Sequence, residues 1–174
     1  MRGFGSRTWL PLGVAVFLMV VPRTSHAQYA VGADASAVTS SGGAWGLGID
    51  GRFGYRFGLP RAWIWHNPIF QLEAIAGYQH LFSGSQDVDV GRLGGGGRIG
   101  FLVGAFEPFG FAHISVADTA GGWGSLWDAG VALDWRAPTF NVGVHGARDS
   151  LSVGTVTDDL WELGLHFEIR GFWL

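Results

Sequence analysis

The sequence lacks two residue types on which many secreted and nucleic-acid-binding proteins depend. It contains no cysteine and no lysine, and charged residues make up 14% of its 174 positions. The absence of cysteine excludes a small scaffold held together by disulfide bonds. The absence of lysine argues against a nucleic-acid partner and against a polybasic membrane anchor. The charge content is also low for a solvated surface, of which about 25–35% is normally charged.

Long apolar runs are scarce as well. One run of 13 residues, 9–21, follows two arginines and precedes the small residue Ala27. A membrane-spanning helix needs about 20 apolar residues, whereas a positive start, a short apolar centre and a small residue before the cleavage point are typical of a signal peptide. The sequence therefore predicts a signal peptide over 1–27, cleaved after Ala27, and one exported domain over 28–174.

Alternation of apolar and polar residues is what the sequence has in abundance, and the tract 160–174 shows it best. Its odd positions are Trp161, Leu163, Leu165, Phe167, Ile169, Gly171 and Trp173. Its even positions from 162 onward include Glu162, Gly164, His166, Glu168 and Arg170. Successive side chains of a strand point to opposite faces, so one face of this tract is apolar and aromatic and the other carries every charge.

Eight tracts of this kind fill the exported domain. They cover 28–38, 44–57, 69–82, 89–106, 109–117, 126–136, 139–147 and 160–174. Turns at three prolines would lie at the periplasmic end: tight ones at Pro108 and Pro138, and a longer, more aromatic connection, 58–68, that contains Pro60 and is an exception to the pattern. Longer polar loops are expected to face outward at 83–87, 118–125 and 148–159. This pattern predicts an all-β protein, an eight-stranded antiparallel up-and-down transmembrane β-barrel.

Alternation alone leaves the orientation of the two faces open. A soluble, lipocalin-like periplasmic binder would show the same alternation with its apolar face turned inward. Two features favour the membrane barrel: the charges keep to one face of the tracts, and aromatic residues gather near tract ends. An eight-stranded barrel has an interior just wide enough for side chains to fill, which suits a polar face rich in glycine.

The C-terminal tract also resembles a known signal. Glu162, Gly164, Phe167 and Ile169 are similar to the C-terminal insertion signal that the barrel-assembly machinery reads, although five more residues follow them. In size and strand number the domain resembles the small OmpA/OmpX-type barrels. That resemblance implies a monomer in the bacterial outer membrane, with membrane lipid and lipopolysaccharide as surroundings and the assembly machinery as a transient partner.

The inward face of the predicted barrel gathers most of the charges. Buried charges must be paired and hydrogen-bonded to be tolerated, so these residues are expected to form an interlocked network that closes the lumen. A narrow ion path is the alternative. The predicted network consists of Asp50, Arg52, Arg56, Glu73, Arg92, Arg98, Asp128, Asp134, Arg136, His145, Glu162, His166, Glu168 and Arg170.

One short motif suggests an enzyme instead. His113 and Ser115 are similar to the His-x-Ser pair on the outer wall of lipid A 3-O-deacylases, which are also eight-stranded barrels. The resemblance implies an acyl hydrolase in which a carboxylate orients the histidine, and the nearest acid at a similar spacing is Asp128. The pair faces lipid if it follows Phe109 and Phe111, but Ile114 and Val116 compete for that face.

No metal or cofactor is predicted. His145, His166 and Glu168 share the inner face of neighbouring tracts, but they lack the close spacing of metal ligands, and hydrogen bonding within the lumen explains them. The expected role is therefore structural, or one of surface interaction through the three polar loops. The lipid A hydrolase and the soluble binder are the alternatives.

Overall fold

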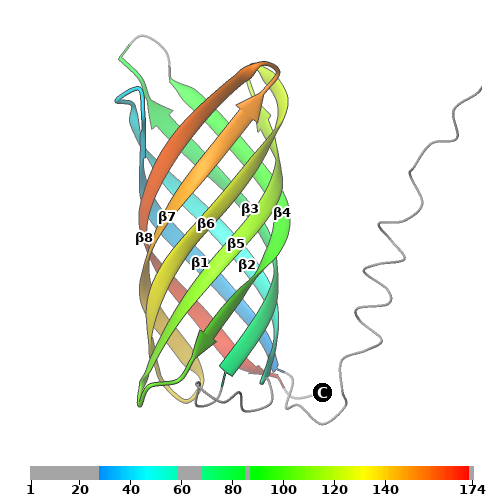
Figure 1. The fold of residues 1–174 in the computed structure, drawn as a ribbon, viewed down its shortest axis with the longest axis vertical. Helices are drawn as coiled ribbons and strands as arrows, with labels where there is room; N and C mark the ends of the chain where they lie inside the picture. Colours follow the sequence, from blue (N-terminus) through cyan, green and yellow to red (C-terminus); the bar gives the residue numbers. More distant parts are fainter. Residues whose placement is uncertain (1–27, 59–67, 85–86, 173–174) are drawn as a thin grey trace, which may run out of the picture.

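The computed structural model describes residues 28–58, 68–84 and 87–172 of the chain. They form eight strands (Figure 1): β1 (Gln28–Ser40), β2 (Trp45–Gly58), β3 (Pro68–Phe82), β4 (Val88–Phe101), β5 (Phe106–Thr119), β6 (Gly122–Arg136), β7 (Phe140–Val153) and β8 (Val156–Phe172). Each strand pairs antiparallel with the next, and β8 pairs with β1, so the sheet closes into a barrel. The predicted eight-stranded antiparallel barrel is confirmed. The expected signal peptide lies outside the described residues.

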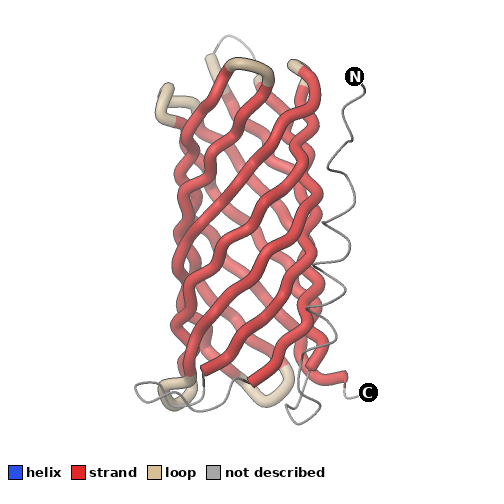
Figure 2. The backbone as a smooth tube through the Cα atoms, turned by 45° about the vertical axis from the view of Figure 1, so that its right-hand side comes forward, coloured by secondary structure: helices blue, strands red, loops and turns tan. Residues whose placement is uncertain are grey.

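The barrel has two distinct ends. We call them upper and lower, following Figure 1. The upper end carries the connections between β1 and β2, β3 and β4, β5 and β6, and β7 and β8, while the lower end carries the start of β1 and the end of β8 (Figures 1 and 2). Among the described residues, no helix is long and apolar enough to cross a membrane.

The prediction of long loops is wrong at two of the upper connections. The predicted loops 118–125 and 148–159 are for the most part strand, because β5 and β6 are joined by residues 120–121 alone and β7 and β8 by residues 154–155. Glycines at the turns, which adopt positive φ easily, make such short connections possible. The polar residues that suggested loops lie instead on strands that continue upward beyond the apolar part of the wall.

The predicted position of one lower turn is also wrong. Pro108 lies inside β5, and the connection from β4 occupies residues 102–105. The register of β4 and β5 begins at the pair Gly100 and Phe109, so Pro108 lies just below the paired segment. Its missing N–H group therefore costs no ladder hydrogen bond on that side. The turn at Pro138 lies between β6 and β7 as expected, and Pro60 is outside the described residues.

The two faces of the wall differ as the alternation requires, with the apolar face outside. On β8, Leu163 and Leu165 are 70% and 63% exposed, whereas Glu162, which precedes them, and His166, which follows them, are buried. A lipocalin-like binder would need the opposite arrangement, an apolar interior around its ligand. The charged interior of this barrel contradicts that alternative.

Near the upper end the interior changes character. An apolar cluster, which we call the upper apolar layer, joins inward-facing side chains from seven strands: Val38, Leu81, Val90, Ala117, Leu126, Leu151 and Leu160. Four of these side chains, those of Val90, Ala117, Leu126 and Leu160, have no solvent-exposed surface. Aliphatic side chains from opposite sides of the barrel therefore pack together inside its upper part. The sequence did not predict this layer.

Candidate functional site in the barrel interior

Below the upper apolar layer the interior is filled by charged and amide side chains, which we call the lumen network. All fourteen residues of the predicted network lie on inward-facing positions, and twelve of them are buried; Arg52 and Arg136 are partly buried. Further buried polar side chains that the sequence did not assign to the network belong to it: Asp34, Gln71, Gln79, Glu107, His113, Asn141 and Asp149.

The centre of the lumen network is built around Arg98 and Glu73. The Arg98 guanidinium donates to Glu168 and, at 2.8 Å, to Gln71, and its Nε lies 3.4 Å from Glu73. The amide of Gln71 in turn donates to Glu73 at 2.9 Å and to Glu168 at 3.0 Å. The Arg98 guanidinium also lies over the Phe109 ring, 4.6 Å from its centroid, a favourable cation–π position. These contacts link β3, β4, β5 and β8 across the lumen.

A second group of ion pairs lies above this centre. Arg92 donates through Nε to Asp50 at 2.6 Å and through a terminal nitrogen to Asp128 at 3.4 Å. On three other strands, β3, β7 and β8, the amide nitrogen of Gln79 lies 3.4 Å from carboxylate oxygens of both Asp149 and Glu162.

At the lower end, Arg56 and Glu107 form a buried ion pair. Arg170 donates to the backbone carbonyl of Ala137 at 2.6 Å, so it ties β8 to the turn between β6 and β7. The sequence placed Glu107 in a turn, and its position inside β5 is what brings it to Arg56. Arg136, at the end of β6, is only half-buried.

The His-x-Ser pair does not face the outer wall. His113 and Ser115 are 6% and 3% exposed and point into the lumen, whereas Ile114 and Val116 are exposed outside. Of the two orientations that the sequence left open, the structure has the one in which Ile114 and Val116 face outward, and it contradicts the outer-wall position that the hydrolase alternative requires. The physical reason lies in the two phenylalanines below, which also face inward and pack beside Arg52 and Arg98 instead of facing lipid.

The hydrogen bonds of His113 also argue against its action as a base for Ser115, the role that the motif suggested. Its Nδ1 lies 2.7 Å from Asp128 and its Nε2 lies 2.8 Å from Glu73. Because a carboxylate oxygen can only accept, both ring nitrogens donate and the ring is a cation. It has no lone pair with which to take a proton from Ser115, whose Oγ has no hydrogen-bond partner among the described residues.

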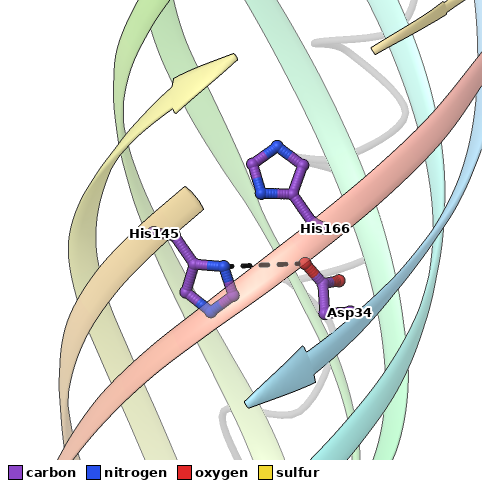
Figure 3. Close-up of side chains that lie close together, drawn as sticks. All are labelled: Asp34, His145 and His166. Atoms are coloured by element: carbon purple, nitrogen blue, oxygen red, sulfur yellow. Dashed lines mark ion pairs between the residues drawn. The ribbon is translucent and has the colours of Figure 1, made fainter. Parts of the chain in front are cut away.

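The other two lumen histidines are bonded differently. His145 and His166, on β7 and β8, lie together with Asp34 of β1 in what we call the histidine cluster (Figure 3). One ligand-type atom from each residue lies within 4.8 Å of the others, and Nδ1 of His145 lies 3.8 Å from Oδ1 of Asp34. The sequence pointed to the two histidines but missed Asp34, which is the single charged residue of the first tract.

Each histidine of the cluster is anchored through its other nitrogen. Nε2 of His145 lies 2.9 Å from Glu162, and Nε2 of His166 is hydrogen-bonded to Asp134. Nδ1 of both rings is buried and has no hydrogen-bond partner among the described residues. Asp34 is held on one side only, through Oδ2, which lies 2.5 Å from Nε of Arg52. Its Oδ1 therefore stays free to face the two imidazoles.

Two glycines make room for these rings. His145 lies opposite Gly164 on β8, and His166 lies opposite Gly143 on β7. A Cβ atom at Gly164 would lie 2.4 Å from Cε1 of His145, and one at Gly143 would lie 2.7 Å from Cε1 of His166. Any larger residue at either position would displace a ring, so the backbone itself shapes the cluster.

Comparisons with known proteins identify the fold. No protein-family model and no curated protein matches the chain. Among solved structures, Neisserial surface protein A is similar with a TM-score of 0.60 and 12% identity, over 84% of this chain and 98% of that one. The outer-membrane enzyme PagL is similar with a TM-score of 0.54 and 17% identity, over 79% of this chain and 98% of that one. The chain therefore has the fold of the small eight-stranded outer-membrane barrels. At these identities the likeness concerns the fold alone.

Proposed function

We propose that the protein is an integral outer-membrane barrel with a closed lumen and a structural role in the cell envelope. The observation that carries the proposal is the composition of the outer wall. Large apolar side chains are exposed on all parts of it, including Leu47, Leu93, Ile114, Val131 and Leu163, each at least 56% exposed. A protein with this wall in water would expose far more contiguous apolar surface than soluble proteins tolerate.

The distribution of charge supports the same placement. Among the described strand residues, charged side chains that face outward lie only near the upper ends of strands: Asp89, Asp118, Arg148 and Asp159. The wall below them is apolar, with aromatic side chains such as Trp127 and Trp161 at its upper border and Tyr55 and Trp135 toward its lower end. An apolar band between aromatic borders is the exterior expected of an outer-membrane barrel.

The interior supports a structural role and argues against a channel. The upper apolar layer fills the lumen with aliphatic side chains, and the lumen network below it engages its charges in ion pairs and hydrogen bonds. Recognition by long surface loops also lacks support, because two upper connections consist of two residues each. What remains is a rigid, closed cylinder that contributes its lipid-facing wall to the membrane.

The outer-wall hydrolase is not carried forward, because its residues lie inside the barrel. The proposal includes recognition of the C-terminal insertion signal by the barrel-assembly machinery. Phe167 and Ile169 face outward while Glu162 and Gly164 face inward on the last strand, so an assembly factor would meet one apolar edge. A monomer surrounded by lipid and lipopolysaccharide is the proposed state in the membrane.

Membrane insertion is tested by a matched pair of substitutions on β8. Leu165→Arg places a charge in the middle of the apolar wall and is expected to lower the free energy of unfolding by about 2–4 kcal/mol in lipid vesicles. Val156→Arg, at the upper turn, is expected to cost about 0–1 kcal/mol. Urea unfolding of the two variants measures both values. Equal small losses, together with a wild-type protein that stays soluble without detergent, would refute the membrane placement.

Closure of the lumen is tested by planar-bilayer recording. Purified protein inserted into the bilayer is expected to give no stable conductance, because neither the upper apolar layer nor the lumen network leaves a water-filled path. Leu160→Ala alone is expected to stay silent too, since the lumen network remains below it. A large, stable conductance from the wild-type protein would overturn the closed-lumen proposal.

A further inference from the structure

We propose that Asp34, His145 and His166 bind a divalent transition-metal ion of the zinc class inside the barrel. The ligands would be Oδ1 of Asp34 and Nδ1 of both histidines. Two imidazole nitrogens and one carboxylate oxygen are a ligand set that zinc accepts, with a fourth position for water. All three side chains are almost fully buried, with side-chain exposures of 1%, 1% and 3%.

The distances between the ligand atoms are close to what one ion requires. Bonds to zinc are about 2 Å long, so two atoms bound to the same ion lie at most about 4 Å apart. Oδ1 of Asp34 and Nδ1 of His145 already lie 3.8 Å apart, and each of the three residues offers one ligand atom that lies within 4.8 Å of those of the other two. Small side-chain rotations would therefore bring all three onto one ion without any movement of the strands.

The hydrogen bonds behind the rings strengthen the assignment. Metal-binding histidines usually donate their other N–H group to a carboxylate, which fixes the tautomer and the ring orientation. His145 is bonded in this way to Glu162, and His166 to Asp134, in both cases through Nε2. With the proton held on Nε2, the lone pair of each ring lies on Nδ1, the atom that faces Asp34.

His113 shows what a purely structural lumen histidine looks like in the same barrel. Both of its nitrogens are engaged by carboxylates, Asp128 on one side and Glu73 on the other. His145 and His166 each have only one nitrogen engaged. If both were protonated cations instead, two buried Nδ1–H groups would lack an acceptor among the described residues, which is costly in a protein interior.

The charge of the lumen also accommodates a dication. Nine buried carboxyl groups face the interior: Asp34, Asp50, Glu73, Glu107, Asp128, Asp134, Asp149, Glu162 and Glu168. Six guanidinium groups face it as well: Arg52, Arg56, Arg92, Arg98, Arg136 and Arg170. Near the histidine cluster itself, the carboxyl groups of Asp34, Asp134 and Glu162 meet two guanidinium groups: that of Arg52, 2.5 Å from Asp34, and that of Arg98, 4.0 Å from Asp134. A bound dication would offset part of this negative excess.

Such an ion would join the strands where the barrel closes. Asp34 lies on β1, the first strand, and the two histidines lie on β7 and β8, the last two. The β1–β8 seam has no covalent turn to hold it, so a metal bridge across it would resist opening of the sheet. Because the ion binds the folded barrel and not the open chain, its binding energy adds to folding stability.

The test uses untagged protein, refolded in detergent with and without zinc and then dialysed. His80 lies on the outside beside Asp87 and Asp89 and offers a second, exposed place for metal, so the experiments use a His80→Ala background. We expect one zinc per chain after dialysis, an unfolding midpoint that rises with zinc concentration, and a visible absorption band when cobalt replaces zinc. Absence of bound zinc and of any stabilisation overturns the proposal.

Matched variants assign the site. His145→Gln and His166→Gln keep an amide that can bond to Glu162 or Asp134 but remove the ligand nitrogen, and each is expected to weaken zinc binding at least about 100-fold. His113→Gln is the control and is expected to retain zinc. Heat-modifiable gel mobility checks that each variant folds, and if one does not, Asp34→Asn takes its place. Equal loss in the control, or full binding by folded His145→Gln, overturns the assignment.

Discussion

The upper and lower parts of the lumen solve one problem with opposite chemistry. Both must fill the inside of an eight-stranded barrel. The upper apolar layer does so with aliphatic side chains, whose burial is favourable and makes no demand on partners. The lumen network does so with charges, each of which loses its hydration and depends on specific partners. The upper layer thus needs only apolar side chains of suitable size, whereas the network requires particular side chains from particular strands to meet.

The largest expected effect comes from the network. Arg98→Met removes the guanidinium that contacts Glu73, Gln71 and Glu168, and it leaves two buried carboxylates without that partner. Breaking a buried charge cluster on one side typically costs about 3–5 kcal/mol. We expect a loss of that size in the free energy of unfolding, measured by urea titration in lipid vesicles. A loss under about 1 kcal/mol would show that water screens these groups and that the network is not a dry filling.

How much of this interior the sequence could reveal depends on the strand. Within 161–170 of β8 and 92–99 of β4, charges occupy one parity and large apolar residues the other, so alternation predicted the faces of Arg92, Arg98, Glu162 and Glu168. On β5, large apolar residues occupy both parities. The rule that aromatic residues face lipid then failed, because Phe109 packs inside against a guanidinium.

Other features depend on contacts that one tract cannot show. Asp34 meets His166 only because the first strand pairs with the last, and that register appears on closure of the barrel. Leu151, which belongs to the upper apolar layer, lies in a segment whose polar residues suggested a loop. Leu160, another member, precedes the charged residues on the same face of β8. In each case the deciding partner lies on a distant strand, and no local pattern of residues encodes it.

A smaller effect is expected from the upper apolar layer. Val90→Ala removes two buried carbon atoms from a side chain with no exposed surface. Each buried methylene is worth about 0.8 kcal/mol and the remaining cavity adds to the loss, so we expect a decrease of about 2 kcal/mol in the free energy of unfolding.

Val156→Ala, at the exposed upper turn, is the matched control for this change and should lose much less. If Val90→Ala lowered the free energy of unfolding as much as Arg98→Met, the contrast between the upper apolar layer and the lumen network would not hold.

The smallest effect is expected where the same chemistry lies outside the barrel. Arg148 pairs with Asp159 at 2.7 Å, but these side chains are 51% and 38% exposed. Exposed pairs contribute about 0–1 kcal/mol and weaken with salt, because water solvates both partners once they separate. Arg148→Met is therefore expected to change the free energy of unfolding by less than about 1 kcal/mol at low salt, and by less again at high salt, in the same urea titration. Suppose that Arg148→Met lowered the free energy of unfolding as much as Arg98→Met, with no dependence on salt. Burial in the lumen would then not be the reason why Arg98 contributes more to stability than Arg148.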